Sequence, residues 1–249
     1  MEKAVTENLL KNLKGRGLFH TISRLRYLPY KMQTALQAVE AIGKSRNPRF
    51  VIDDENRFAY ENLIRWVHGD PEMKCLDPAT KEIVTGRLNA GIYIAGSTGT
   101  GKSWALEIMA AYSLIDNVNV NIGEHRRPLF WKNVRTDAIC DEYTATGSFD
   151  KFKKIQIVGF QDLGAEPKES LYMGNRINVM QQILEYRGDR TDLITHITSN
   201  LPFHLPKSIE PTKETIDKAI YGRFGDRVAS RLNEMCNYFE IKGKDRRRC

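Results

Sequence analysis

The sequence predicts an α/β fold in which a parallel sheet is covered by helices on both faces. From Gly91 onward, short β-prone runs alternate with segments of helical periodicity, an alternation that is typical of parallel sheets. A glycine-rich segment, 96–103, lies between an apolar run and a helical segment, as expected for a phosphate-binding loop. At 249 residues the chain can hold one such domain of about 190 residues and a small appendage.

Two helices are expected before the sheet, over 4–14 and 29–43, because apolar residues recur there at spacings near 3.6. The polar segment 43–48 contains Gly, Asn and Pro and is the best candidate for a linker. A third helix is expected after 53–56, and it ends at 69–71 because proline cannot continue a helix.

The remaining elements follow from the alternation. Strands are expected over 91–95, 129–134, 154–160, 192–198 and 238–242. Helices are expected near 103–115, 136–143, 174–187 and 214–232.

The positive charge of the chain is concentrated at its N-terminus. The net charge is +7, and residues 1–50 hold ten Lys/Arg against three Asp/Glu, which leaves 28 of each sign in residues 51–249. This asymmetry predicts a basic helical N-terminal region, 1–49, that binds a polyanion or an acidic protein face. A basic helix that is merely solvated is the alternative. The larger domain is predicted over 50–249.

Composition favours a cytoplasmic protein without a membrane partner. No apolar run approaches the ~18 residues of a membrane helix, and the N-terminus lacks the apolar core of a secretion signal. The four cysteines are far apart and form no C-x-x-C pair, which fits a reduced chain better than a disulfide framework.

The segment 96–103 satisfies the phosphate-loop (Walker A) pattern G-x-x-x-x-G-K-[ST] and predicts a nucleotide-binding site. Glycines let backbone N–H groups approach phosphate oxygens, Lys102 supplies charge to the β- and γ-phosphates, and the Ser103 hydroxyl can ligate Mg²⁺. A glycine-rich surface turn is the alternative. The predicted binding residues are Gly96, Ser97, Thr98, Gly99, Thr100, Gly101, Lys102 and Ser103.

Further site residues are expected where later strands end, because an open α/β sheet binds its ligand there. Asp162 follows the strand 154–160 and can hold Mg²⁺ or orient the attacking water; a turn or capping aspartate is the alternative. Asn200 follows the strand 192–198 and can reach the γ-phosphate or that water, unless it only forms an Asn-Leu-Pro turn.

Two arginines late in the chain, Arg227 and Arg231, are four residues apart and share a helix face. An exposed guanidinium there can reach the nucleotide of a neighbouring subunit and stabilise transition-state charge. A surface salt bridge is equally compatible with the spacing.

Four motifs in this order resemble the AAA+ ATPases of the DnaC/DnaI helicase-loader type, with IstB transposition ATPases as close relatives. They are GSTGTGKS (96–103), QDLGAE (161–166), ITSNLPF (197–203) and YGRFGDRVASRLNEMC (221–236), and the resemblance covers residues 50–248. It implies an AAA+ P-loop NTPase core without a separate lid domain. It also implies Asn200 as the sensor-one residue, Arg231 with Arg227 as a second candidate for the arginine finger, and Arg247 near the γ-phosphate.

The resemblance implies an ATP- and Mg²⁺-dependent protein that loads a replicative helicase onto single-stranded DNA and self-associates through the arginine-finger interface. The N-terminal region would hold the helicase, which matches a basic arm on a charge-neutral core. A transposase-helper ATPase with the same core is the nearest alternative, and an adaptor that binds ATP with little hydrolysis is another. A small-molecule kinase fits worst, because it leaves the paired arginines unexplained.

Gln161 departs from the family pattern, which carries two acidic residues before Leu-Gly. A neutral amide is a poorer ligand for a hard cation than a carboxylate, so slow hydrolysis is expected. On this interpretation, Gln161→Asp raises the ATPase rate.

Overall fold

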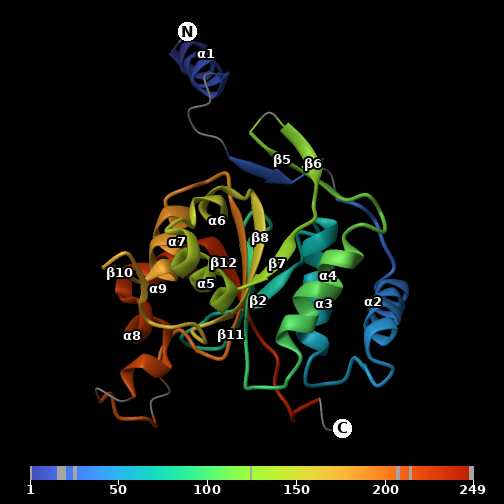
Figure 1. Ribbon diagram of the computed structural model, residues 1–249. Coiled ribbons are helices and arrows are strands. Elements are labelled where there is room, and N and C mark those ends of the chain that lie inside the picture. The colour runs from blue at the N-terminus through green and yellow to red at the C-terminus, as the bar shows by residue number, and fades with distance from the viewer. Residues whose placement is uncertain are drawn as a thin grey trace.

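Figure 1 shows a computed structural model of the protein, which describes residues 2–15, 21–24, 27–123, 125–205, 208–212 and 215–246. The predicted α/β class is confirmed, since a mostly parallel sheet lies between two layers of helices.

The described residues form a seven-stranded sheet in the order β3-β2-β12-β4-β11-β8-β7. Five strands, from β12 to β7, run parallel, and β2 and β3 add an antiparallel edge. Every residue of the central strand β4 is buried, as expected of a parallel strand covered on both faces. The strands are β2 (Lys74–Leu76), β3 (Ile83–Thr85), β4 (Gly91–Ala95), β7 (Lys132–Arg135), β8 (Ile157–Leu163), β11 (Ile194–Ser199) and β12 (Cys236–Glu240).

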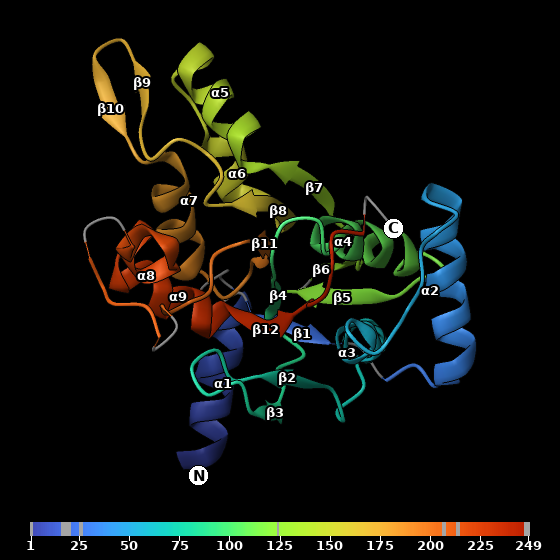
Figure 2. The ribbon, with the colours of Figure 1, turned by 90° about the horizontal axis from the view of Figure 1, so that it is seen from below.

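The helices divide between the two faces of this sheet (Figure 2). One face carries α2 (Met32–Arg46), α3 (Arg57–His68) and α4 (Lys102–Tyr112). The other carries α5 (Thr136–Thr146), α6 (Asp150–Lys154), α7 (Val179–Gly188), α8 (Ile220–Phe224) and α9 (Asp226–Met235). Along β4 the side chains alternate between two hydrophobic clusters: Ile92 and Ile94 join the first face, and Tyr93 and Ala95 the second.

Two predicted helices differ from the structure. The first part of 174–187 belongs to a hairpin, β9 (Ser170–Tyr172) and β10 (Asn175–Ile177), whose turn contains Gly174 at φ 83°. The helix α7 starts only after Asn178, whose side chain accepts a hydrogen bond from Gln181 N at 3.0 Å. The predicted helix 214–232 is divided into a 3₁₀ turn (Ile216–Lys218), α8 and α9, because Gly225 between the last two has φ 85° and ψ 162°.

The N-terminal part of the chain is joined to the core more closely than the sequence indicates. Val39 of α2 is fully buried in the same cluster as α3 and α4. Gly43 is helical rather than a linker residue, and the ring of Phe50 lies where its Cβ would be. Beyond α1 (Glu2–Gly15), β1 (Ile22–Arg24) pairs with β5 (Asn119–Ile122), and β5 pairs with β6 (His125–Pro128), in a three-stranded sheet absent from the prediction. The domain division at 49/50 stays a prediction.

No helix in the described part of the chain has the length and apolar content needed to cross a bilayer. Of the four cysteines, Cys75, Cys140 and Cys236 are free and buried, and Cys249 lies outside the described residues.

Candidate nucleotide-binding site

The phosphate loop connects the C-terminal end of β4 to the first turn of α4. Gly99 and Gly101 have φ values of 83° and 96°, a region that side chains rarely adopt, and a Cβ on Gly99 would lie 2.2 Å from Asp245 Oδ1. Lys102 is buried, and its Nζ donates a hydrogen bond to Ser97 O at 2.7 Å. The loop is therefore a curved backbone at a helix N-terminus, a geometry that binds phosphate.

A cavity of about 290 Å³ lies over this loop and brings the predicted residues together. Asp162 from the end of β8 and Asn200 from the end of β11 both line it, together with phosphate-loop residues. Four other lining residues were not predicted from the sequence as site residues: Trp104, Arg135, Ala165 and Arg246. Parallel strands whose carboxyl ends meet at one edge account for the convergence.

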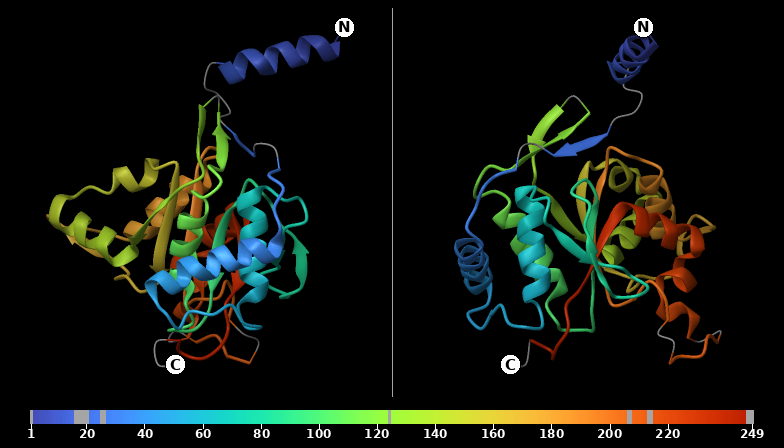
Figure 3. Two further views of the ribbon diagram at one scale, coloured as in Figure 1. Left: turned by 90° about the vertical axis from the view of Figure 1, so that its right-hand side faces the viewer. Right: turned by 180° about the vertical axis from the view of Figure 1, so that it is seen from behind.

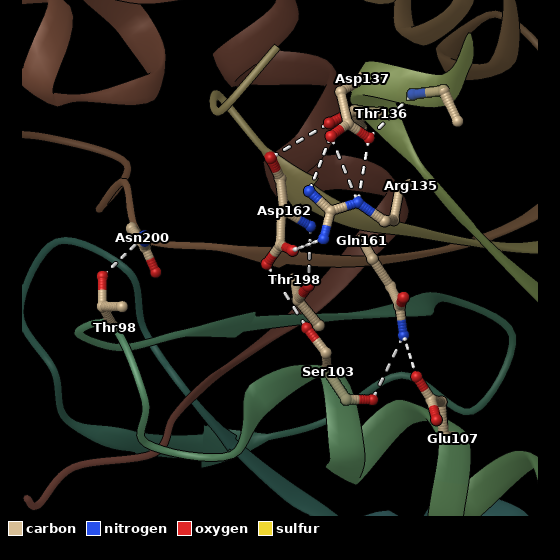
Figure 4. Close-up of polar contacts among 11 residues, drawn as sticks. Thr98, Ser103, Glu107, Arg135, Thr136, Asp137, Gln161, Asp162, Thr198 and Asn200 are labelled. Atoms are coloured by element: carbon tan, nitrogen blue, oxygen red, sulfur yellow. Dashed lines mark hydrogen bonds and ion pairs between the residues drawn. The ribbon is translucent and has the colours of Figure 1, made fainter. Parts of the chain in front are cut away.

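Asp162 and Ser103, the two predicted Mg²⁺ ligands, face each other, with Oδ1 and Oγ 3.4 Å apart (Figure 4). Two neighbouring oxygens around an octahedral Mg²⁺ lie about 3 Å apart, so this hydroxyl and carboxylate fit the ion. The backbone of Asp162 has a φ of 61°, where β8 and β11 shift register. Thr198 Oγ1 accepts from Asp162 N at 3.0 Å, and Thr136 Oγ1 donates to Asp162 O at 3.1 Å, so this unusual conformation is held from both sides.

Asn200 reaches the phosphate loop from β11. Its Nδ2 donates to Thr98 Oγ1 at 3.3 Å (Figure 4). The amide thus lines the same cavity as Lys102.

Gln161 does not line the cavity. Its side chain is buried and donates from Nε2 to Glu107 Oε1 at 2.9 Å and to Ser103 O at 3.4 Å, so it faces α4 (Figure 4). The Glu107 carboxylate also forms an ion pair with Arg46 at the end of α2. The residue that the sequence presents as a weakened metal ligand is instead a contact between β8 and the phosphate-loop helix.

Arg135, at the end of β7, adds positive charge beside Asp162. Its Nη1 lies 3.7 Å from Asp162 Oδ2, and its guanidinium binds both oxygens of Asp137, with Nη2–Oδ2 at 2.6 Å. Hydrogen bonding from Arg135 lowers the pKa of the Asp137 carboxyl. The signal that could have found Arg135 is its place after a predicted parallel strand, 129–134, since residues at such ends meet at the site.

Arg246 lies on the tail that follows β12 and crosses the phosphate loop. Its backbone N donates to Gly99 O at 2.9 Å, and its guanidinium binds Asp53 through two 2.8 Å hydrogen bonds. This pairing lowers the pKa of Asp53 and raises that of Arg246. Arg246, Trp104 and Phe50 also line a second cavity, of about 350 Å³. The predicted γ-phosphate contact, Arg247, lies outside the described residues.

Arg227 and Arg231 lie on α9 and do not line the nucleotide cavity of their own chain. Both contact Asp189 at the end of α7: Arg231 forms a hydrogen-bonded ion pair with it, and Arg227 Nη2 lies 3.7 Å from its Oδ2. Arg227 is 65% exposed and Arg231 32% exposed. The shared helix face predicted from the spacing is therefore a surface face.

No family model and no curated protein matches this sequence. Solved structures that resemble the chain include DnaA from Aquifex aeolicus bound to AMPPCP (15% identity, TM-score 0.43) and domain III of the replication initiation protein DnaA from Thermotoga maritima (14%, 0.45). A third is the replication initiator DnaA bound to AMPPCP and single-stranded DNA (16%, 0.44). The matches cover 80%, 78% and 79% of this chain but only 50%, 65% and 49% of those chains, so this chain spans less than two thirds of their length.

Proposed function

We propose that the protein is an AAA+ ATPase that binds ATP with Mg²⁺, self-associates through an arginine finger and loads a replicative helicase onto single-stranded DNA. One observation carries the nucleotide part of this proposal. The phosphate loop, Asp162 and Asn200, which are separated by up to about a hundred positions in sequence, line one cavity at the ends of β4, β8 and β11.

Each residue has a role that its position supports. The phosphate-loop N–H groups and Lys102 bind the β- and γ-phosphates, and Asn200 orients the γ-phosphate or the attacking water. Ser103 and Asp162 would hold Mg²⁺, which when bound neutralises charge on the phosphate oxygens. The second cavity, at Phe50 and Trp104, adjoins the first through Arg246 and gives the base and ribose an aromatic site.

Slow hydrolysis is supported by the number of carboxylates in the cavity. Among the described residues that line it, Asp162 is the sole acid, and it lies beside both Ser103 and Arg135. One carboxylate must therefore both bind the metal and activate the attacking water. Two groups would perform these roles more efficiently than one, so slow hydrolysis is expected.

The proposed self-association rests on the two arginines of α9. Arg231 and Arg227 are on the surface and outside their own cavity, so the nucleotide they serve would belong to a neighbouring copy. A guanidinium supplied in trans in this way stabilises the charge that develops on the transferred phosphoryl group. ATP would then control how the copies associate.

The partner protein is inferred from the positive charge of the N-terminal region. A basic segment ahead of a charge-neutral domain is suited to holding an acidic protein face while the ATPase domain assembles. We propose that this acidic protein is a replicative helicase. A transposase-helper function remains the alternative, because the core of those ATPases has the same motifs.

Light scattering, affinity capture and an ATP-turnover assay on the 249-residue chain test the proposal. Light scattering should show a larger assembly with Mg²⁺ and a non-hydrolysable ATP analogue than without, and Lys102→Ala should remove this difference. A protein that stays monomeric with analogue and oligonucleotide present contradicts the proposal. Affinity capture should recover a hexameric helicase; recovery of a transposase would select the alternative, and assembly without any turnover would select the adaptor.

A further inference from the structure

The two cavities beside the phosphate loop share part of their walls. One, of about 290 Å³, lies over the loop, and the other, of about 350 Å³, is lined by Phe50. Trp104 and Arg246 line both. In a nucleoside triphosphate the sugar joins the phosphates to the base. With the phosphates in the first cavity and the base beside Phe50, the ribose lies at the wall that the two cavities share.

A carboxylate lies next to this shared wall. Asp53, in the loop between α2 and α3, lines the second cavity and binds the guanidinium of Arg246 through two hydrogen bonds of 2.8 Å. The tail that carries Arg246 and the loop that carries Asp53 lie at the end of the molecule that holds the phosphate loop (Figures 1 and 3). Asp53 is therefore held beside a residue that lines both cavities.

The Asp53 carboxylate can accept a further hydrogen bond. Its Oδ1 accepts from Arg246 Nη2 and, at 3.1 Å, from Glu55 N, whereas its Oδ2 accepts from Arg246 Nη1. Each carboxylate oxygen has about two acceptor sites, so within the described part of the chain one site on Oδ2 remains. The Asp53 side chain is 37% exposed, so a ligand in the cavity can reach that site.

The charge of Asp53 favours a hydroxyl group as its ligand partner. Hydrogen bonding from Arg246 lowers the pKa of the carboxyl, so Asp53 is ionised at neutral pH and accepts hydrogen bonds without donating any. Phosphate oxygens are acceptors with negative charge, and they are repelled by it. The 2′- and 3′-hydroxyls of a ribose are donors. The 6-amino group of adenine is also a donor, but it lies at the end of the base farthest from the sugar.

The two acids that follow Asp53 in the loop are placed differently. Glu55 also lines the second cavity, but it lies against the tail: a Cβ on Gly243 would be 1.8 Å from Glu55 Oε2, which is 3.5 Å from Arg246 Nη2. Asp54 is exposed and lines neither cavity. Asp54 therefore offers a matched control for a change of charge at Asp53.

We propose, on the basis of the proposed function, that Asp53 is a specificity-determining residue that accepts a hydrogen bond from a ribose hydroxyl, so that the site selects ribonucleotides over deoxyribonucleotides. Arg246 orients the carboxylate from the shared wall. This contact requires neither hydrolysis nor assembly, so nucleoside diphosphates suffice to measure it.

The test is isothermal titration of the 249-residue chain with ADP, 2′-deoxy-ADP and 3′-deoxy-ADP in the presence of Mg²⁺. The parent should bind ADP about tenfold more tightly than at least one deoxy form, because a hydrogen bond to a charged group contributes about this factor. Asp53→Asn should reduce the ratio to about threefold, since a hydrogen bond to a neutral amide is about half as strong. Asp53→Ala should abolish the preference; if it fails to fold, Asp53→Asn decides. Asp54→Asn should keep the ratio of the parent.

The ratio of two affinities separates sugar recognition from a structural role. A carboxylate that only holds the loop and the tail would affect ADP and the deoxy forms equally, so an unchanged ratio in Asp53→Asn would overturn the proposal. Equal binding of all three nucleotides by the parent would also overturn it, while leaving the proposed nucleotide binding intact. Binding of none of them would overturn the proposed function, and the role of Asp53 with it.

Inosine diphosphate, which lacks the 6-amino donor, distinguishes the sugar from the base. Asp53→Asn should leave the ratio of the ADP and inosine diphosphate affinities as it is in the parent. A change in this ratio, with the preference for ribose unchanged, would assign Asp53 to the base and overturn the proposal.

Discussion

The side-chain amide of Gln161 donates to the carboxylate of Glu107, 2.9 Å away, and so contacts the phosphate-loop helix rather than the nucleotide. Glu107 is also paired with Arg46, which links α2, α4 and the end of β8 through three side chains. An aspartate at position 161 would remove this donor and, although one methylene shorter, would place a second carboxylate near Glu107 in a buried contact. The neutral residue at this position is therefore matched to the acid opposite it.

This geometry reverses the effect expected for Gln161→Asp from the sequence. We expect the single variant to be destabilised by about 1–2 kcal/mol and to hydrolyse ATP more slowly, because two carboxylates meet in a buried site. The double variant Gln161→Asp/Glu107→Gln should recover most of the stability. Chemical denaturation and steady-state turnover of the parent and three variants form a double-mutant cycle. Faster turnover by the single variant would show that position 161 serves the metal after all.

The sequence predicts much of this site because its signals are local. The phosphate loop is a fixed pattern, and Asp162 and Asn200 follow apolar runs that read as strands. Which of Gln161 and Asp162 faces the cavity depends on the φ of 61° at Asp162, and nothing in the residue types predicts that value. Arg246 is not predicted because its place depends on the tail crossing the phosphate loop, a contact between distant segments. Trp104 directly follows the phosphate-loop pattern, which specifies no residue type at that position.

The short strands were missed for a related reason. β1, β5 and β6 have three or four residues each, and β9 and β10 three, too few for a periodic pattern to be distinguished from a loop. Their pairing partners lie far away or across a tight turn, so pairing rather than propensity defines them. The predicted helix 214–232 is interrupted at one glycine, Gly225, whose backbone conformation no other residue adopts readily.

Asp162→Asn tests the metal site. Asparagine tolerates the left-handed backbone of this position, so the fold should be retained. Loss of the charge should reduce Mg²⁺-dependent hydrolysis by about a hundredfold, because a neutral amide is a poor ligand and a poor base. Turnover is measured as a function of Mg²⁺ concentration. Asp141→Asn is the control, since Asp141 is an exposed residue of α5 that does not line the cavity. Equal losses in both variants would exclude a specific role for Asp162.

Arg231→Ala tests the arginine finger. The variant should bind an ATP analogue like the parent, because Arg231 is outside its own cavity, yet lose most of its turnover. Mixing it with Lys102→Ala, which retains the arginine but not the phosphate contact, should restore part of the activity, since each variant supplies what the other lacks. Arg227→Ala should have a smaller effect if Arg231 is the finger. Mixtures that remain inactive would argue against a site shared between copies.

A comparison of Arg246→Ala with Arg247→Ala tests which tail arginine serves the nucleotide. The Arg246 side chain lies at the cavity, 18% exposed and bound to Asp53, so its loss should weaken binding of an ATP analogue about tenfold and loosen the tail. Arg247→Ala should have the larger effect only if the family resemblance identifies the γ-phosphate contact correctly. Isothermal titration on both variants distinguishes these outcomes.

His196 predicts a pH dependence of stability. Its ring is fully buried, 5.1 Å from that of Trp66 and 4.3 Å from that of Trp131 between centroids, and neither ring nitrogen has a hydrogen-bond partner. Burial lowers its pKa to about 3, below the ordinary value near 6.5. The unfolded chain therefore binds the proton first as pH falls. The stability that the neutral ring contributes is complete above about pH 6.5 and is lost towards pH 3, at about 1.4 kcal/mol per pH unit.

The free energy of unfolding should be measured by denaturant titration at pH 7.5 and pH 5 for the parent and for His196→Phe. The parent should lose about 2 kcal/mol more than the variant over this interval, because phenylalanine fills the apolar site without titrating. Comparing the two proteins removes the contribution that the carboxylates and His68 make to the pH dependence, because both proteins contain these groups. The pKa of His68 is also lowered by burial. His125→Ala, at an exposed position of β6, should follow the parent at both pH values. The same loss in the parent and in His196→Phe would mean that the acid sensitivity arises from other groups.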